Sequence, residues 1–243
     1  MKKKQIFLLT FLKLILFAGA VIILVFSSYW LYEYNKERRE NEKLAKRVVS
    51  ESSAGQVAPI SVDFEKLKQE NDDIIAWLYC EGTPINYPVV RAEDNSYYLH
   101  RKTDGEYSFS GTLFADYLNK GDFSDNNTII YGHNMKNDTM FGTLAEYRNQ
   151  EYFNEHLEMY LLTPDKEYKV ELVAGVTENS TSMVYKLPLK DEDKKKIICE
   201  MLEKSTFEAE YTFSSNDKFV MLSTCSYVYD DARYVLVGVL KEL

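Results

Sequence analysis

Three residues at the ends of expected strands have the clearest chemical potential, and the first is Cys225. It follows the apolar run KFVMLST and opens the polar segment CSYVYDD. Such a position exposes a thiol while the strand fixes its backbone. Cys80 and Cys199 instead fit the usual role of a lone cysteine as a small buried hydrophobe, because one lies in an aromatic run and the other on the apolar side of a helical pattern. Cys225 is therefore the candidate nucleophile.

A cysteine nucleophile needs a partner, because a free thiol has a pKa of about 8.5 and is only a few per cent thiolate at neutral pH. A neighbouring histidine supplies a base or an imidazolium that favours the thiolate. His133 ends the run TIIYGHNM, and we expect Gly132 to allow a tight turn before it. His100 and His156 lie among charged residues and are expected on the surface. His133 is therefore the candidate partner.

Arg233 lies eight residues after Cys225 and opens the run RYVLVGV. If CSYVYDDA is the loop of a hairpin, Arg233 returns beside Cys225. A cation there would stabilise a thiolate and donate to the oxyanion of a tetrahedral intermediate. The alternative is a surface ion pair with Asp230 or Asp231.

The strands that must position these residues are expected from residue 61 onward. Eight short runs of strand-favouring residues, separated by turn residues, are IAWLYC, INYPVV, GTLFAD, NTIIYG, EMYLLT, YKVELVAGV, KFVMLST and RYVLVGV. Repeated short strands indicate a sandwich or a closed barrel. Pro84 and Pro88 confine the second run to a sheet edge or a bulge. The fold class is mainly β.

Two helices accompany the strands. The pattern from Asp63 to Asn71 predicts a short helix. A stronger one is expected near residues 190–204, where Asp191 can cap a segment with Ile197 and Ile198 on its apolar side. The charged remainder EDKKK is interpreted as a solvated face.

The first fifty residues predict a membrane anchor. From Leu14 to Tyr32 there are 19 residues without a charge, enough to span a hydrocarbon core of about 30 Å. Four aromatic residues lie at the end of this segment, where an interfacial aromatic belt is expected: Tyr29, Trp30, Tyr32 and Tyr34. A cleaved signal peptide ending at Ala18-Gly19-Ala20 is the alternative, but the apolar run VIILVF continues past that site. A buried core helix is disfavoured by the lysines around the segment.

Basic residues flank the apolar segment on both sides, so the positive-inside rule does not fix its orientation. We expect three parts: residues 1–35 as a cytoplasmic tip and transmembrane anchor, 36–60 as a charged helical stalk and linker, and 61–243 as the catalytic domain.

Charge and cysteine content exclude several classes of protein. The net charge is −9, and residues 1–50 carry +6, which leaves −15 on the remainder. Because residues 51–243 are this acidic, they are expected to bind phosphate groups poorly, and no nucleic-acid partner is expected. Three cysteines without a C-x-x-C pair exclude a disulfide-dense scaffold and a thiolate zinc cluster. No metal or cofactor is expected.

Together these residues resemble the sortases, the cysteine transpeptidases of Gram-positive cell surfaces. The resemblance rests on LSTC, on the histidine of YGHNM and on the arginine eight residues after the cysteine. It extends over nearly all of residues 61–243 through NDDIIAWLYCEGTPINYPVV, DNSYYLH, GTLFAD and NTIIYGHNMKNDTMFGTL. These stretches look like the class B branch, whose members insert a long helix between their sixth and seventh strands. The resemblance implies an eight-stranded β-barrel with peripheral helices.

The resemblance also implies a mechanism. The Cys225 thiolate would attack the carbonyl after the threonine of a sorting signal carried by a secreted protein, giving a thioacyl enzyme. His133 would protonate the departing amine and later deprotonate the incoming one, while Arg233 would hold the oxyanion. The acceptor would be an amine of a lipid II-type cell-wall precursor or of a pilin. Because the family's substrates are extracellular, the catalytic domain would lie outside a single-pass anchor in the cell membrane.

Further positions match the family's substrate groove. Asn95 and Leu99 match a substrate-contacting pair in the DN-x-x-YL element, Tyr131 and Ser223 match groove residues, and Tyr185 matches an aromatic wall. Ser226 departs from the pattern, since some class B enzymes carry an acidic residue after the cysteine. The class A calcium site is not expected.

Two other functions stay open at the level of sequence. A cysteine hydrolase would use the same thiol and histidine and pass the acyl group to water. A catalytically silent surface module would bind wall polymer or peptide, although it would have no need for Cys225, His133 and Arg233 together.

Overall fold

The computed structural model describes residues 2–53 and 57–243. Of Lys2, Lys3 and Tyr34 it describes the backbone alone, so the Tyr34 side chain expected in an aromatic belt lies outside the described residues, as do positions 54–56 of the expected linker. The chain falls into two compact units, Met1–Glu42 and Lys43–Leu243.

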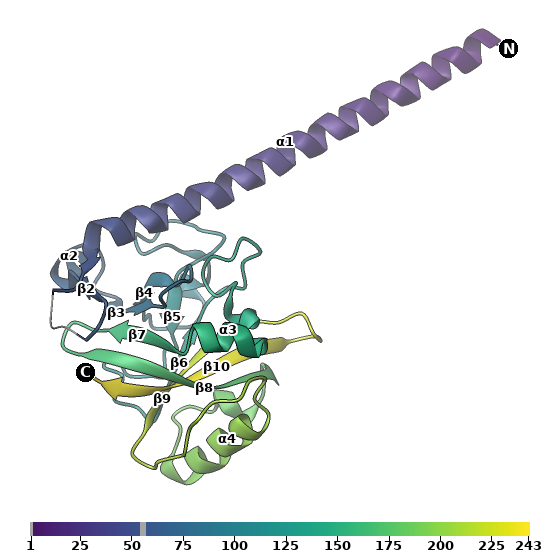
Figure 1. Ribbon diagram of the computed structural model, residues 1–243. Helices are drawn as coiled ribbons and strands as arrows, with labels where there is room; N and C mark the ends of the chain where they lie inside the picture. The colour runs from purple at the N-terminus through teal and green to yellow at the C-terminus, as the bar shows by residue number, and fades with distance from the viewer. Residues whose placement is uncertain (1, 54–56) are drawn as a thin grey trace. The chain divides into compact units, whose positions relative to one another are not determined.

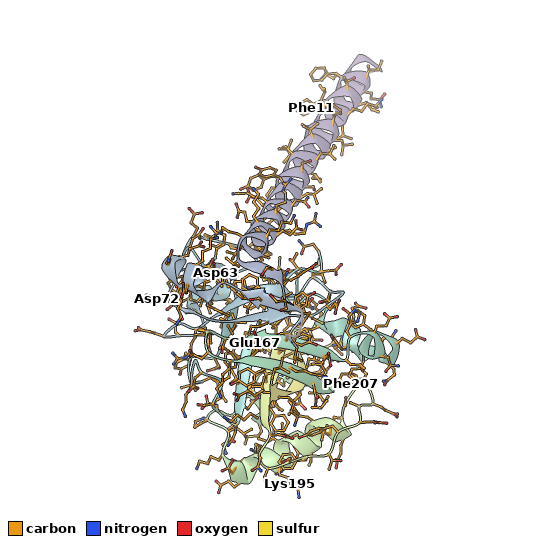
Figure 2. All side chains as sticks on the ribbon, turned by 60° about the vertical axis from the view of Figure 1, so that its left-hand side comes forward. Phe11, Asp63, Asp72, Glu167, Lys195 and Phe207 are labelled. Atoms are coloured by element: carbon orange, nitrogen blue, oxygen red, sulfur yellow. The ribbon has the colours of Figure 1, made fainter. Side chains whose placement is uncertain are left out.

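A single helix, α1 (Lys2–Val48), forms the first unit and continues into the second. From Lys4 onward it is long and apolar enough to cross a membrane, and none of its most apolar window is buried by protein. Figure 2 shows side chains projecting around this helix, Phe11 among them. The charged residues after position 35 continue the helix without a break. The expected anchor and the start of the expected stalk are therefore one continuous helix.

The second unit is built on a closed barrel of eight strands in the order β10-β8-β7-β3-β4-β5-β6-β9 (Figure 1). The strands are β3 (Ile74–Tyr79), β4 (Asn86–Val90), β5 (Leu113–Ala115), β6 (Asn127–Tyr131), β7 (Glu158–Leu162), β8 (Glu167–Asn179), β9 (Lys218–Cys225) and β10 (Ala232–Glu242). Each of the eight predicted runs forms one of them. The barrel, and not the sandwich, is the architecture.

The expectation of an edge position for the second run is wrong, because β4 lies between β3 and β5. Pro88 is tolerated there because β5 pairs only with the next two residues, Val89 and Val90. Pro88 itself faces Trp77 of β3. A register shift between Ile74 and Ala76 on β3 lies close by, so the bulge alternative describes the region better.

Short elements surround the barrel. β1 (Val49–Glu51) pairs antiparallel with β2 (Ile60–Val62), so part of the expected linker is a two-stranded sheet. α2 (Phe64–Glu70) begins where expected, with the Asp63 carboxylate accepting a hydrogen bond from the Lys66 backbone N–H at 3.0 Å. The remaining elements are the 3-10 helices η1 (Tyr97–His100), η2 (Leu144–Arg148) and η3 (Met183–Tyr185) and the helix α3 (Gln150–Glu155).

The helix α4 (Asp191–Glu203) lies between β8 and β9, the sixth and seventh strands of the barrel, as the resemblance implies. Ile197 and Ile198 are buried in one cluster with residues of β8, β9 and β10. Asp191 is not the cap: Lys190 holds that position without a side-chain hydrogen bond, and the Asp191 carboxylate accepts from Asn126 Nδ2 at 2.8 Å.

The interpretation of EDKKK as a solvated face is wrong at Lys194, whose exposure is 2%. Its ammonium donates to Asn126 Oδ1 at 3.1 Å and to the carbonyls of Ser215 at 2.5 Å and Asp217 at 3.2 Å. These acceptors lie far from Lys194 in sequence, so helical periodicity could not reveal them. The neighbouring Lys195 is exposed on the outer face of α4 (Figure 2).

Candidate active site

The hairpin of β9 and β10 brings Cys225 and Arg233 together. Cys225 is the last residue of β9, and Arg233 stands directly opposite it in the antiparallel register. On its other side Arg233 faces Glu178 of β8. Within the described part of the chain, Arg233 forms no ion pair with Asp230 or Asp231, both of which are exposed. The hairpin expected from the sequence is confirmed, and the surface ion pair is not formed.

His133 comes to the same end of the barrel because β6 runs parallel to β9, with Tyr131 opposite Ser223. Beyond that pair, three hydrogen bonds join the segment that follows β6 to the last residues of β9. The Gly132 N–H donates to the Ser223 carbonyl at 3.1 Å and the Thr224 hydroxyl donates to the Gly132 carbonyl at 2.8 Å. Asn134 Nδ2 donates to the Cys225 carbonyl at 2.7 Å.

Gly132 is needed for close packing, not for the expected tight turn. Its φ lies outside the left-handed region, but a Cβ atom there would collide with the side chains of Leu113 and Phe141. A larger residue would push the histidine loop away from the barrel.

The His133 ring is held at its edge by η1. Its Nε2 lies 2.8 Å from the Leu99 carbonyl oxygen. Because a carbonyl only accepts hydrogen bonds, Nε2 carries the proton in this arrangement. The ring is half-buried, as are Cys225 and Arg233.

These side chains line one cavity of 310 Å³ at the end of the barrel. All eight residues singled out from the sequence border it: Asn95, Leu99, Tyr131, His133, Tyr185, Ser223, Cys225 and Arg233. Gly132, singled out for its expected turn, also borders the cavity, and three further lining residues were not singled out from the sequence: Phe114, Ser180 and Thr224. Thr224 directly precedes Cys225, and that position was the available signal.

Asp116 is the functional side chain that sequence reasoning missed. It is almost fully buried, and one of its carboxylate oxygens accepts from both the Tyr131 hydroxyl and Asn95 Nδ2, each at 2.9 Å. Asn95 in turn accepts from the Tyr117 N–H at 3.0 Å. Burial, and after it the Asp116 charge, raises the pKa of Tyr131. Asp116 therefore orients Tyr131 and Asn95 on the wall of the cavity.

The opposite wall is aromatic. The Tyr185 hydroxyl lies 2.8 Å from the Ser223 hydroxyl, and the rings of Tyr185 and Tyr131 stack with centroids 6.4 Å apart. Burial raises the pKa of Tyr185 to about 12, although the nearby Arg233 charge acts in the other direction. Both tyrosines are neutral at physiological pH, and their hydroxyl groups are held by Asp116 and Ser223.

The arrangement suits acyl transfer through a thioester. It combines a half-buried thiol, an imidazole and a guanidinium around one opening, with neutral polar groups along the walls. Among residues 2–53 and 57–243 no group of three or more His, Cys, Asp or Glu side chains is placed to hold a metal ion. Fold and site together define the class of cysteine-dependent acyl-transfer enzymes.

Comparison with known proteins gives the particular family. The sortase domain family matches residues 78–241. Sortase B of Listeria monocytogenes is 33% identical over 218 residues, which cover 86% of each chain. A crystal structure of Bacillus anthracis sortase B superimposes with a TM-score of 0.76 at 30% identity, covering 88% of this chain and 100% of that one. A Staphylococcus aureus sortase B–substrate complex gives 0.72 at 25% identity, covering 86% and 94%.

The chain belongs to the sortase family and is a class B sortase, a cysteine transpeptidase. Sortases act on proteins that carry sorting signals and are associated with the cell surface. The eight-stranded barrel implied by the sequence resemblance is confirmed.

Proposed function

We propose that this sortase cleaves a C-terminal sorting signal after threonine, with Cys225 as nucleophile, His133 as proton donor and acceptor, and Arg233 as the oxyanion donor. The observation that carries the proposal is the convergence of these three side chains on one cavity. The register of β9 against β10 and the hydrogen bonds between the Cys225 and His133 segments support it.

The first step forms the thioester. The Cys225 thiolate attacks the carbonyl carbon after threonine, and the new C–S bond places negative charge on the former carbonyl oxygen. Arg233 donates to that oxygen. As the C–N bond breaks, the amine leaves with a proton from His133, which starts the step as imidazolium.

The second step transfers the acyl group to an amine. The acceptor nitrogen attacks the thioester, its proton passes to His133, and Cys225 leaves as thiolate. The acceptor is an amine of a lipid II-type precursor or of a pilin. Asn95, Leu99, Tyr131, Ser223 and Tyr185 form the groove that holds the sorting signal. This assignment is supported by the fact that all five residues line the same cavity.

The enzyme works at the cell membrane as a single-pass protein with its catalytic domain outside. The length and apolar character of α1 support residues 1–35 as the cytoplasmic tip and anchor, followed by a stalk and linker at 36–60 and the catalytic domain at 61–243.

The decisive experiment incubates the full-length chain in detergent with a library of sorting-signal peptides, with and without amines. A chain that begins at residue 61 is avoided because Val48 and Ile60 pack in a core cluster with Trp77 and would be missing from it. Mass spectrometry should find an acyl adduct on Cys225 and an amine-dependent ligation product. Release of free acid alone would favour the hydrolase, and binding without cleavage would favour the silent module.

A further inference from the structure

His100, expected as an ordinary surface residue, stacks on the face of His133. The two ring centroids are 5.3 Å apart and the ring planes differ by 23°. His100 also stacks with Tyr107, with centroids 6.2 Å apart and planes at 28°. His100 is an exposed residue, yet its ring contacts two aromatic neighbours.

The contact complements the hydrogen bond at the edge of the same ring. Leu99 and His100 are consecutive residues of η1. The Leu99 carbonyl oxygen accepts a hydrogen bond from His133 Nε2, and the His100 ring covers the face of the His133 ring. A hydrogen bond at one nitrogen leaves the ring free to tilt about that bond, whereas a stacked ring restricts the tilt. The two contacts together fix the orientation of the imidazole.

The segment that makes both contacts is itself anchored. The Ser108 N–H donates to the His100 carbonyl and the Thr112 N–H to the Tyr98 carbonyl, each at 3.1 Å. Gly111 has a φ of +59°, and a Cβ atom there would collide with the carbonyl oxygens of Leu99 and Tyr98. Since only glycine adopts this conformation without strain, the loop packs closely under η1 and holds it in place.

We propose that His100 is a positioning residue that keeps the His133 imidazole oriented for proton transfer during acylation. The inference rests on the proposed role of His133. Proton transfer depends steeply on geometry, and a displacement of about 1 Å can change a rate by about a hundredfold. The aromatic face of His100 carries the effect, so another aromatic ring replaces it and a small side chain does not.

The test compares variants of the full-length chain in detergent, using single-turnover formation of the thioacyl enzyme with a peptide substrate. His100→Ala should slow the acylation step by about tenfold or more, while the peptide concentration at half-saturation changes less than about twofold. His100→Phe should return the rate to within about threefold of the parent, whereas His100→Leu, which has bulk but no ring, should behave like His100→Ala.

His156→Ala is the matched control. His156 also packs against an aromatic ring, that of Tyr152, with centroids 4.4 Å apart and planes at 32°, but it does not line the cavity. Its replacement should leave acylation unchanged. A fall equal to that of His100→Ala would overturn the inference, because it would show a general effect of losing a histidine packed against an aromatic ring.

A spectroscopic measurement separates this inference from the proposed function. The ring resonances of His133 in a carbon–proton correlation spectrum should move when His100 becomes alanine, because the ring current of His100 is lost. If His133→Ala abolishes acylation but His100→Ala acylates at the parent rate, only the positioning role is overturned. If His133→Ala itself acylates normally, the proposed function fails and this inference fails with it.

Discussion

At the scale of single residues, the surroundings of the three cysteines differ in ways that decide their chemistry. Cys225 is half-buried beside His133 and Arg233 in the cavity. Cys80 is completely buried, and burial raises the pKa of its thiol. A raised pKa keeps the thiol protonated and unreactive. Cys199 lies on α4, away from the cavity-lining residues.

We therefore expect Cys225→Ala to abolish both peptide cleavage and amine transfer. Cys80→Ala and Cys199→Ala should keep both activities, because neither thiol reaches the cavity. Mass spectrometry of the peptide products measures the outcome. Catalysis that survives in Cys225→Ala would contradict the mechanism.

Arg233→Ala should acylate about a hundred- to a thousandfold more slowly than the parent, since a donor to a developing oxyanion contributes roughly 2.7–4 kcal/mol. The melting temperature should be nearly normal, because Arg233 forms no ion pair with Asp230 or Asp231 in the described structure and its side chain is half-buried. Arg233→Lys should recover only part of the rate, as it keeps the charge but loses the planar fork. Rapid-quench measurement of thioacyl-enzyme formation tests this prediction. An acylation rate of Arg233→Ala within a few-fold of the parent would show that Arg233 does not stabilise the oxyanion.

The residue after Cys225 is a serine, Ser226, and not an acidic residue. Ser226 accepts a hydrogen bond from Arg148 Nη2 at 2.9 Å, and the Arg148 guanidinium lies over the Tyr234 ring at 4.7 Å. The Ser226 N–H donates to the Ala232 carbonyl at 2.8 Å. These contacts hold the start of the hairpin loop without a carboxylate.

At the scale of elements, two regions depend on contacts between distant parts of the chain. Asp116, at the end of β5, orients Asn95 and Tyr131 from two other segments. Lys194 ties α4 to Asn126, just before β6, and to the carbonyls just before β9. The inserted helix is therefore joined to the barrel by a polar anchor as well as by its apolar face.

Lys194→Ala should lower the free energy of unfolding by about 1–3 kcal/mol, because the hydrogen bonds that its buried ammonium donates to Asn126, Ser215 and Asp217 are lost. Lys195→Ala is the matched control on the same helix, and its exposed position predicts a change within about 0.5 kcal/mol. Chemical denaturation of both variants gives the comparison. Equal stabilities would mean that solvent replaces the Lys194 ammonium without cost.

At the scale of the whole molecule, the long apolar helix α1 is the feature from which we predict where the enzyme works. We expect the N-terminus to be retained as a membrane anchor, because the apolar run continues past Ala20 and the helix extends to Val48 without a break. Mass analysis of the mature protein should find the intact N-terminus. A chain beginning at Val21 would show cleavage instead.

The catalytic domain is expected outside the cell. Protease treatment of intact cells should remove it and leave the anchor behind. Protection of the domain in intact cells, with digestion after lysis, would show the opposite orientation. The charges around the anchor do not decide between the two.

The sequence by itself determined the eight strands, the class B helix and the pairing of Cys225 with Arg233. These depend on local patterns: apolar runs bounded by turn residues, and two residues separated by one hairpin loop. The residue pattern also indicated His133 as the partner of Cys225, and the resemblance to sortases added five groove residues; all of them line the cavity.

Only the tertiary structure decided the interior place of β4, the burial of Lys194, the contacts of Asp116 and the stacking of His100 on His133. Each of these depends on a partner far away in the chain. A charged or aromatic residue looks the same in sequence whether it faces solvent or a distant segment. Its environment is set by which strands pair and which loops meet at the end of the barrel, and local periodicity carries no information about that.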